Sequence, residues 1–203
     1  MFEAAGVAVF ALTGALVAAR KGMDPFGFIL LATVTGVGGG TLRDLLLGVP
    51  VFWVRDPRDV LICSGVALIG WTIAFARPGR LDGWSAKRLL IWADAAGLAL
   101  FCVVGTRKAL GVEVPMLSAI ALGAMTASFG GIIRDILAGE RPMVLWSRDF
   151  YVTAAAAGAG ATAILASFGL PLPIVMAGGL LVGFGLRAGS ILFGWSFPKL
   201  PGT

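Results

Sequence analysis

Two arginine–aspartate pairs stand inside an otherwise strongly apolar chain. Arg43 and Asp44 close the segment GGGTLRD, and Arg134 and Asp135 close the segment FGGIIRD, 91 positions further along. Ionisable side chains within apolar segments are costly and mark ion or substrate pathways. Glycine-interrupted segments at corresponding places in two halves of a membrane protein indicate the same. The sequence therefore predicts a transport path.

We expect the two segments to line this path and its gate. The predicted residues are Gly38, Gly39, Gly40, Arg43, Asp44, Ser128, Phe129, Gly130, Gly131, Arg134 and Asp135. The glycines are expected to break their helices, leaving carbonyl ends that could coordinate a cation and N–H ends that favour an anion or carboxylate. The alternative is that these glycines only permit close helix packing.

The charged pairs have more than one reading. Sequence neighbours on a helix do not face each other, so we expect Arg43 to pair with Asp135, and Arg134 with Asp44, across a symmetry axis. Asp44 could instead form a capping box with Thr41, although Ile132 replaces the threonine in the second copy. The cluster could gate the path or serve purely as a structural clamp.

Composition excludes several function classes. The chain of 203 residues is 58% hydrophobic and 13% charged, whereas soluble domains carry about 25% charged residues. It has no histidine, and Cys63 and Cys102 lie in apolar runs, which excludes a Cys/His zinc site and a histidine-based triad. With no nucleophile–base constellation, we expect no enzyme, resident metal or cofactor, although lipid could bind. The net charge of +5 is assigned to loops and not to nucleic-acid binding.

A bilayer core about 30 Å thick needs ~20 apolar residues as helix. Seven spans meet this expectation: Phe2–Ala19, Pro25–Gly48, Val60–Ala76, Leu89–Thr106, Val114–Ala138, Phe150–Phe168 and Pro171–Phe193. The second and fifth are expected to be interrupted at their glycine clusters. The fold class is thus an all-α membrane protein, with residues 1–203 as a single transmembrane domain.

The repeat extends beyond the charged pairs. AGVAVF at residues 5–10 matches AGLALF at residues 96–101, and Glu3 falls on Asp94 at the same offset. Repeat 1 covers about residues 1–80, repeat 2 about residues 88–170, and an extra helix about residues 171–194. Three spans per unit make the second copy enter from the opposite side, so the repeats are expected to be inverted.

Basic residues predict the orientation. Nine lie in loops expected on one side: Arg20, Lys21, Arg77, Arg80, Lys87, Arg88, Arg141, Arg148 and Lys199. Four lie on the other: Arg55, Arg58, Arg107 and Lys108. The richer side should be cytoplasmic, with the N-terminus outside and the C-terminus inside a multi-pass inner-membrane protein.

Three further charged residues each have two possible roles. Glu3 and Asp94 could line vestibules that concentrate cations, or simply be exposed at the interface. Arg187, in the last span, could snorkel or pair with an acidic residue. Glycines spaced four apart at residues 179–189 suit a close helix contact, either within a subunit or between subunits.

The doubled GG(G)xxRDxxxxG signature, followed by Pro50 and Pro142, resembles the prokaryotic branch of the trimeric intracellular cation channel family. That branch overlaps proteins described by a glycine-transporter domain. The resemblance implies a homotrimer with one ion path within each subunit, lined by the second and fifth spans, which would be kinked at their glycine clusters. It also implies potassium-preferring, weakly selective conduction, in which K⁺ or Na⁺ passes transiently. Phe129 departs from the pattern by replacing the first glycine of the second copy, where it could narrow the path or act as an apolar gate. A secondary carrier of glycine or another small zwitterion uses the same parts and is the alternative; a scaffold without a path is a third reading.

Overall fold

A computed structural model describes residues 2–79, 81, 83–146, 149–196 and 198. Met1, Arg80, Arg148, Lys199 and Thr203, on which the orientation prediction partly rests, lie outside this set. The described part contains nine helices: α1 (Phe2–Arg20), α2 (Pro25–Leu46), α3 (Phe52–Arg55), α4 (Arg58–Ala76), α5 (Trp84–Leu110), α6 (Met116–Leu137), α7 (Met143–Trp146), α8 (Val152–Ser167) and α9 (Leu172–Phe193).

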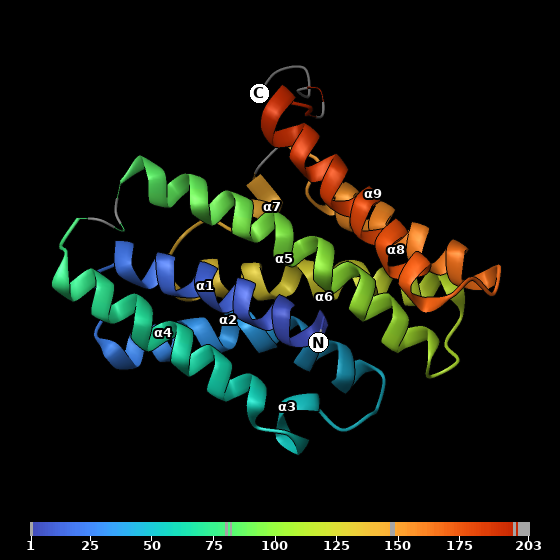
Figure 1. The fold of residues 1–203 in the computed structure, drawn as a ribbon, viewed down its shortest axis with the longest axis horizontal. Coiled ribbons are helices and arrows are strands. Elements are labelled where there is room, and N and C mark those ends of the chain that lie inside the picture. Colours follow the sequence, from blue (N-terminus) through green and yellow to red (C-terminus); the bar gives the residue numbers. More distant parts are fainter. Residues whose placement is uncertain (1, 80, 82, 147–148, 197, 199–203) are drawn as a thin grey trace.

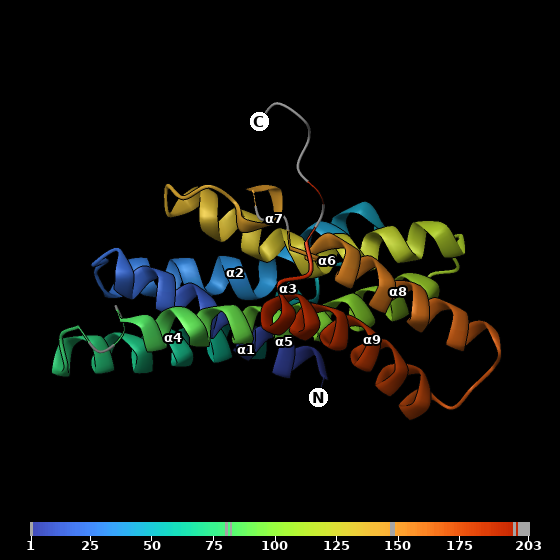
Figure 2. The same cartoon turned by 90° about the horizontal axis from the view of Figure 1, so that it is seen from above.

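The helices repeat with the sequence. α2 and α6 begin and end 91 positions apart, and so do the short helices α3 and α7, which the apolar pattern did not predict. α1 and α5 run in opposite directions, as do α2 and α6 (Figure 1). α4 packs on α1 and α2, whereas α8 packs on α5 and α6. These two equivalent helices lie on opposite sides of the molecule (Figures 1 and 2).

Both glycine clusters lie inside uninterrupted helices, which corrects the predicted breaks in spans 2 and 5. The glycines instead allow α2 and α6 to cross in close contact. A Cβ atom at Gly39 would collide with the carbonyl oxygen of Thr126, and one at Gly130 would collide with that of Thr35. Backbone therefore meets backbone, which only glycine permits. The close-packing alternative is the one that the structure supports.

Within the described part of the chain, six helices are long and apolar enough to cross a membrane. They are α1, α2, α4, α5, α6 and α9. α8, which corresponds to the predicted span Phe150–Phe168, has only 16 residues, or about 24 Å at 1.5 Å per residue. The count of seven spans is therefore not confirmed by helix length.

The small residues of α9 contact the same chain. A Cβ atom at Gly179 would collide with Thr162 on α8, and Gly183 lies against Cys102 and Gly158. α8 and α9 lie side by side in both views (Figures 1 and 2). Gly179 and Gly183 therefore serve a contact within the subunit, whereas a Cβ atom at Gly185 would meet nothing within 4 Å among the described residues.

Candidate functional site

The first charged cluster forms at the last turns of α2. Arg43 and Asp44 are fully buried, and Nε of Arg43 donates to Oδ1 of Asp44 at 2.8 Å. Nη2 of Arg43 also lies 3.4 Å from Oε1 of Glu3 on α1. The second oxygen of Asp44 accepts the backbone N–H of Phe52 at 3.0 Å and binds Nζ of Lys108 on α5 at 2.8 Å. One carboxylate thus ties three helices together.

The second cluster repeats this design at the last turns of α6. Nε of Arg134 donates to Oδ1 of Asp135 at 2.9 Å, and Nη1 lies 3.2 Å from Oδ1 of Asp94 on α5. Nη1 also donates to Oγ1 of Thr13 at 2.9 Å. Oδ2 of Asp135 accepts the backbone N–H of Met143, the first residue of α7, at 2.9 Å. Asp94 thus occupies the place of Glu3, and Met143 that of Phe52.

The predicted pairing across the axis is wrong, because each arginine binds its neighbouring aspartate. The contacts of Gly39 with Thr126 and of Gly130 with Thr35 centre the antiparallel crossing about six residues before each arginine. At 1.5 Å per residue the two arginines are separated by about 18 Å along the helices, too far for each to reach the carboxylate of the other repeat. A long guanidinium side chain can instead fold back on the adjacent aspartate, since both lie at a helix end.

The capping alternative for Asp44 is also not observed. Thr41 donates to the carbonyl oxygen of Val37 at 2.7 Å and accepts Nε1–H of Trp53 at 2.8 Å. Asp44 satisfies the first N–H of α3 instead of one in α2. Because Asp135 does the same for α7, both aspartates have one explanation: they orient the short helix that follows each repeat's second span.

The remaining predicted residues surround the crossing. A Cβ atom at Gly38 would lie 3.2 Å from the side chain of Ile133, and one at Gly40 would lie 2.7 Å from the ring of Phe52. Ser128 is buried and donates to the carbonyl oxygen of Ala124 at 2.8 Å, while Phe129 is half-buried. The predicted set therefore forms one continuous region, with a charged cluster on either side of a tight contact.

Glu3 and Asp94 differ in exposure, although both bind the arginine of their own half. The side chain of Glu3 is 35% exposed and that of Asp94 is 1% exposed. A cavity of about 200 Å³ opens beside the second cluster, and Arg134, Asp135 and Met143 contribute to its lining. Its other lining residues include Arg20, Lys87, Glu140 and Arg141. The two clusters thus have different access to the surface.

Sequence reasoning missed Phe52, Met143, Lys108 and Tyr151. Phe52 and Met143 each follow their aspartate by eight positions, a constant spacing that could have revealed them. Lys108 was counted only as a loop charge. Tyr151 is buried at the start of α8, and its hydroxyl group faces the Arg134–Asp94 pair across Gly131. No spacing in the sequence indicated that role.

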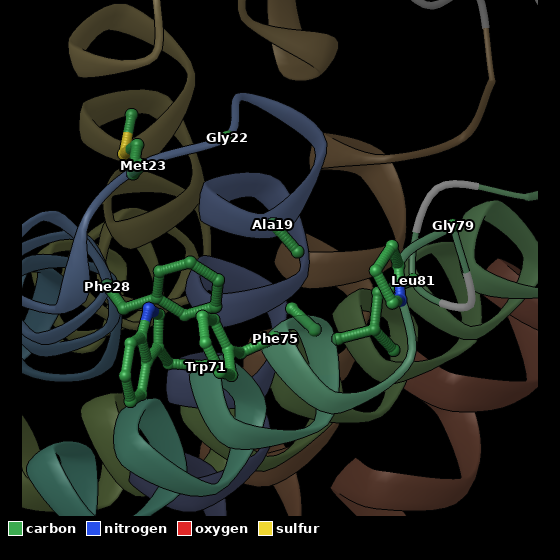
Figure 3. Close-up of a pocket in the computed structure, with 10 residues that line it drawn as sticks. Ala19, Gly22, Met23, Phe28, Trp71, Phe75, Gly79 and Leu81 are labelled. Atoms are coloured by element: carbon green, nitrogen blue, oxygen red, sulfur yellow. The ribbon is translucent and has the colours of Figure 1, made fainter.

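A second cavity has a different character. It measures about 260 Å³ and lies where α1, α2 and α4 meet (Figure 3). Met23, Phe28, Trp71 and Phe75 contribute to it, with the rings of Trp71 and Phe75 stacked at 5.4 Å. None of the ten residues that line it carries a charge. It is therefore not part of the charged region described above.

Together, the repeated antiparallel helices and their buried ion-pair clusters define a polytopic membrane protein with an internal two-fold repeat. The chain belongs to the family whose model is described as Glycine transporter, which matches residues 1–75 and again residues 91–167. It is 41% identical to the UPF0126 inner membrane protein YadS of Escherichia coli (strain K12), over 95% of this chain and 91% of that protein. It is 36% identical to the UPF0126 membrane protein YvgT of Bacillus subtilis (strain 168), over 96% and 92%.

Solved structures share this fold. The trimeric intracellular cation channel orthologue from Rhodobacter sphaeroides matches with a TM-score of 0.87 and 46% identity, over 96% of this chain and 97% of that one. A prokaryotic channel of the same name, solved in 0.5 M KCl, matches with a TM-score of 0.85 and 26% identity, over 97% and 96%. The sequence-based resemblance to this family is therefore confirmed.

Proposed function

We propose that this protein is a homotrimeric channel for monovalent cations, preferring potassium, with one ion path inside each subunit. The observation that carries the proposal is the match to the Rhodobacter sphaeroides cation channel along nearly the whole chain. The two clusters of buried ion pairs support it, because ionisable groups at membrane depth mark ion pathways. Residues 1–203 form one transmembrane unit in this proposal.

The path runs beside α2 and α6, from the cluster at Asp44 to the cluster at Asp135. The carboxylate oxygens of the two clusters would bind hard cations. Monovalent ions should pass more easily than Mg²⁺, because small divalent ions give up their bound water reluctantly. Glu3 and Lys108, whose side chains are 35% and 30% exposed, connect the first cluster to one surface. The cavity of about 200 Å³ connects the second cluster to the other.

The crossing between the clusters forms the constriction. Here the backbones of α2 and α6 touch at Gly39 and Gly130, with Phe129 beside the contact. Phe129→Ala should raise the conductance by removing an apolar group from this constriction. Phe75→Ala is the matched control, since that ring is 75% exposed on α4 and should leave conductance unchanged. Equal conductance in both variants would place the path elsewhere.

The membrane arrangement is part of the proposal. We place the protein in the inner membrane with α8 as a seventh crossing, which puts the N-terminus outside and the C-terminus in the cytoplasm. The excess of basic residues in the loops after α1, α4 and α6 supports this orientation. Short α8 can cross if the bilayer thins locally or flanking side chains reach the interface.

The alternative function is a secondary carrier for glycine, which corresponds to the description of the matching family model, but the match to solved cation channels along nearly the whole chain favours the channel. Asp44 or Asp135 would then bind the ammonium group. Purified protein in planar bilayers separates the two functions. Discrete current steps in KCl, far above carrier turnover and insensitive to glycine, are expected. Silent bilayers together with uptake of labelled glycine into proteoliposomes would replace the channel with the carrier.

A further inference from the structure

The two clusters differ in how they reach charge neutrality. The first contains two carboxylates, Glu3 and Asp44, and two cations, Arg43 and Lys108. The second contains the carboxylates Asp94 and Asp135, and among the described residues only Arg134 forms ion pairs with them. The position equivalent to Lys108 is Val17, which is fully buried and apolar. The repeat alone therefore leaves one negative charge unmatched.

Arg187 of α9, the helix outside the repeat, lies where the missing cation is needed. Its side chain is 1% exposed, and Nη2 is 3.9 Å from Sδ of Met143. Met143 is equivalent to Phe52, and Nζ of Lys108 lies 5.5 Å from the centre of the Phe52 ring. The two cations thus contact equivalent residues of the two repeats, one from α5 and the other from α9.

Tyr151 separates Arg187 from Arg134. The guanidinium of Arg187 lies 4.9 Å from the centre of the tyrosine ring. The tyrosine hydroxyl, at the other end of the side chain, and Oδ1 of Asp94 lie on the same side of Gly131. A Cβ atom added to this glycine would be 3.5 Å from the hydroxyl and 3.6 Å from the carboxylate oxygen. The ring therefore holds Arg187 near the cluster while keeping the two positive charges apart.

Arg187 is not neutralised by a tight partner of its own. Its Nη1 lies 3.6 Å from Oδ2 of Asp149, whose side chain is 44% exposed and therefore solvated. Nε and Nη1 make no hydrogen bond within the described part of the chain. Among the other basic residues that line the cavity, Arg20 is paired with Glu140 at 3.1 Å. Lys87 and Arg141 are exposed, so salt screens their charges.

We propose that Arg187 is a specificity-determining residue of the ion path. It supplies from α9 the positive charge that Lys108 supplies to the first cluster, and so sets the net charge that a permeant ion meets at the second cluster. This inference rests on the proposed channel function. Removing the charge leaves the cluster with a net charge of −1, which should concentrate cations there.

Unitary currents test the inference. Arg187→Met should raise the potassium conductance at least about twofold at ~0.05 M KCl, and the gain should shrink towards none at ~1 M KCl, where screening is strong. Arg187→Lys keeps the charge and should conduct like the unchanged protein at both concentrations. A gain of the same size at both salt concentrations, or in both variants, would indicate a structural role and overturn the proposal.

Thermal unfolding provides a test that does not depend on conduction. K⁺, compared with the bulky cation N-methyl-D-glucamine at equal ionic strength, should raise the Tm of Arg187→Met more than that of the unchanged protein. The double variant Arg187→Met with Asp94→Asn restores neutrality and should lose this extra stabilisation. Equal K⁺ effects in all three proteins would overturn the charge role of Arg187.

The conductance and melting experiments distinguish failure of the proposed channel function from failure of the proposed role of Arg187. Silent bilayers with the unchanged protein would refute the channel, while the melting comparison would still decide whether Arg187 balances the second cluster. If Arg187→Met does not assemble, recovery of assembly by the added Asp94→Asn change supports the charge balance. Equal loss of assembly in the single and double variants counts against it.

Discussion

The rings of Phe10 and Phe101 stack with their centres 5.2 Å apart and their planes at 21°. These residues are equivalent in the two repeats, so the same side chain meets itself where α1 and α5 pack. A Cβ atom at Gly6 would lie 3.2 Å from the ring of Phe101, and one at Gly97 would lie 2.9 Å from that of Phe10. The pseudo-two-fold axis therefore passes through a core in which glycine faces aromatic ring on both sides.

Alanine at the crossing glycines should destabilise the protein. Gly39→Ala and Gly130→Ala each place a methyl group against a backbone carbonyl, and we expect each to lower the free energy of unfolding by about 1–3 kcal/mol. Gly65→Ala and Gly160→Ala are matched controls in α4 and α8, because a Cβ atom there meets nothing within 4 Å among the described residues. Thermal unfolding in detergent should show a lower Tm only for the crossing variants.

The two buried arginines should differ in their importance for stability. Arg134→Ala leaves Asp94 and Asp135 without their main partner, and both are at most 4% exposed. Losing one partner of a buried pair costs about 3–5 kcal/mol. Arg43→Ala should cost less, because Glu3 is 35% exposed and Asp44 keeps Lys108. A larger loss of folded protein for Arg43→Ala would contradict this ranking.

A double-mutant cycle can test which carboxylate each arginine uses. Alanine changes at Arg43 and Asp44 should couple, since the two side chains share a hydrogen bond of 2.8 Å. Changes at Arg43 and Asp135 should be nearly additive, within about 0.5 kcal/mol, as expected for sites without a shared partner. Unfolding free energies of the single and double variants supply both values. Strong coupling of Arg43 with Asp135 would restore the pairing across the axis.

Glu113 has a strained backbone. Its φ is 59°, whereas the equivalent position in the first repeat is Gly22 with φ 60°. A residue with a Cβ atom loses roughly 1–2 kcal/mol in this left-handed region, so Glu113→Gly should stabilise the protein modestly. Gly22→Ala, which introduces the same strain in the other repeat, should do the opposite. The two Tm shifts, measured side by side, should have opposite signs.

The proposed orientation can be tested with single introduced cysteines. Pro78→Cys, between α4 and α5, should react with an impermeant reagent only from the cytoplasmic side. Val112→Cys, between α5 and α6, should react only from outside. Cys63 and Cys102 are buried and should remain unlabelled, which gives a low background. Labelling of both introduced cysteines from one side would remove α5 as a membrane crossing.

The sequence by itself determined the membrane class, the two-fold repeat and the place of the charged clusters. Apolar runs interrupted by Arg43–Asp44 and Arg134–Asp135 fix where buried charge must be, and an offset of 91 fixes the symmetry. Prolines also mark helix starts, because Pro25 is the first residue of α2 and Pro171 directly precedes α9. These features depend on residue type and on spacing along the chain, both of which can be read from one amino-acid sequence.

Only the tertiary structure decided what the glycines do and which charges pair. A glycine cluster in a membrane helix can interrupt the helix or let another helix pack closely against it. Gly39 and Gly130 do the second, because the backbones of Thr126 and Thr35 contact them from the other helix. The same antiparallel crossing carries Arg43 and Arg134 apart, so each binds its own neighbour. Arg187 likewise gained its place from the packing of α9 on α5 and α8. Such contacts join residues distant in sequence, and no local pattern specifies them.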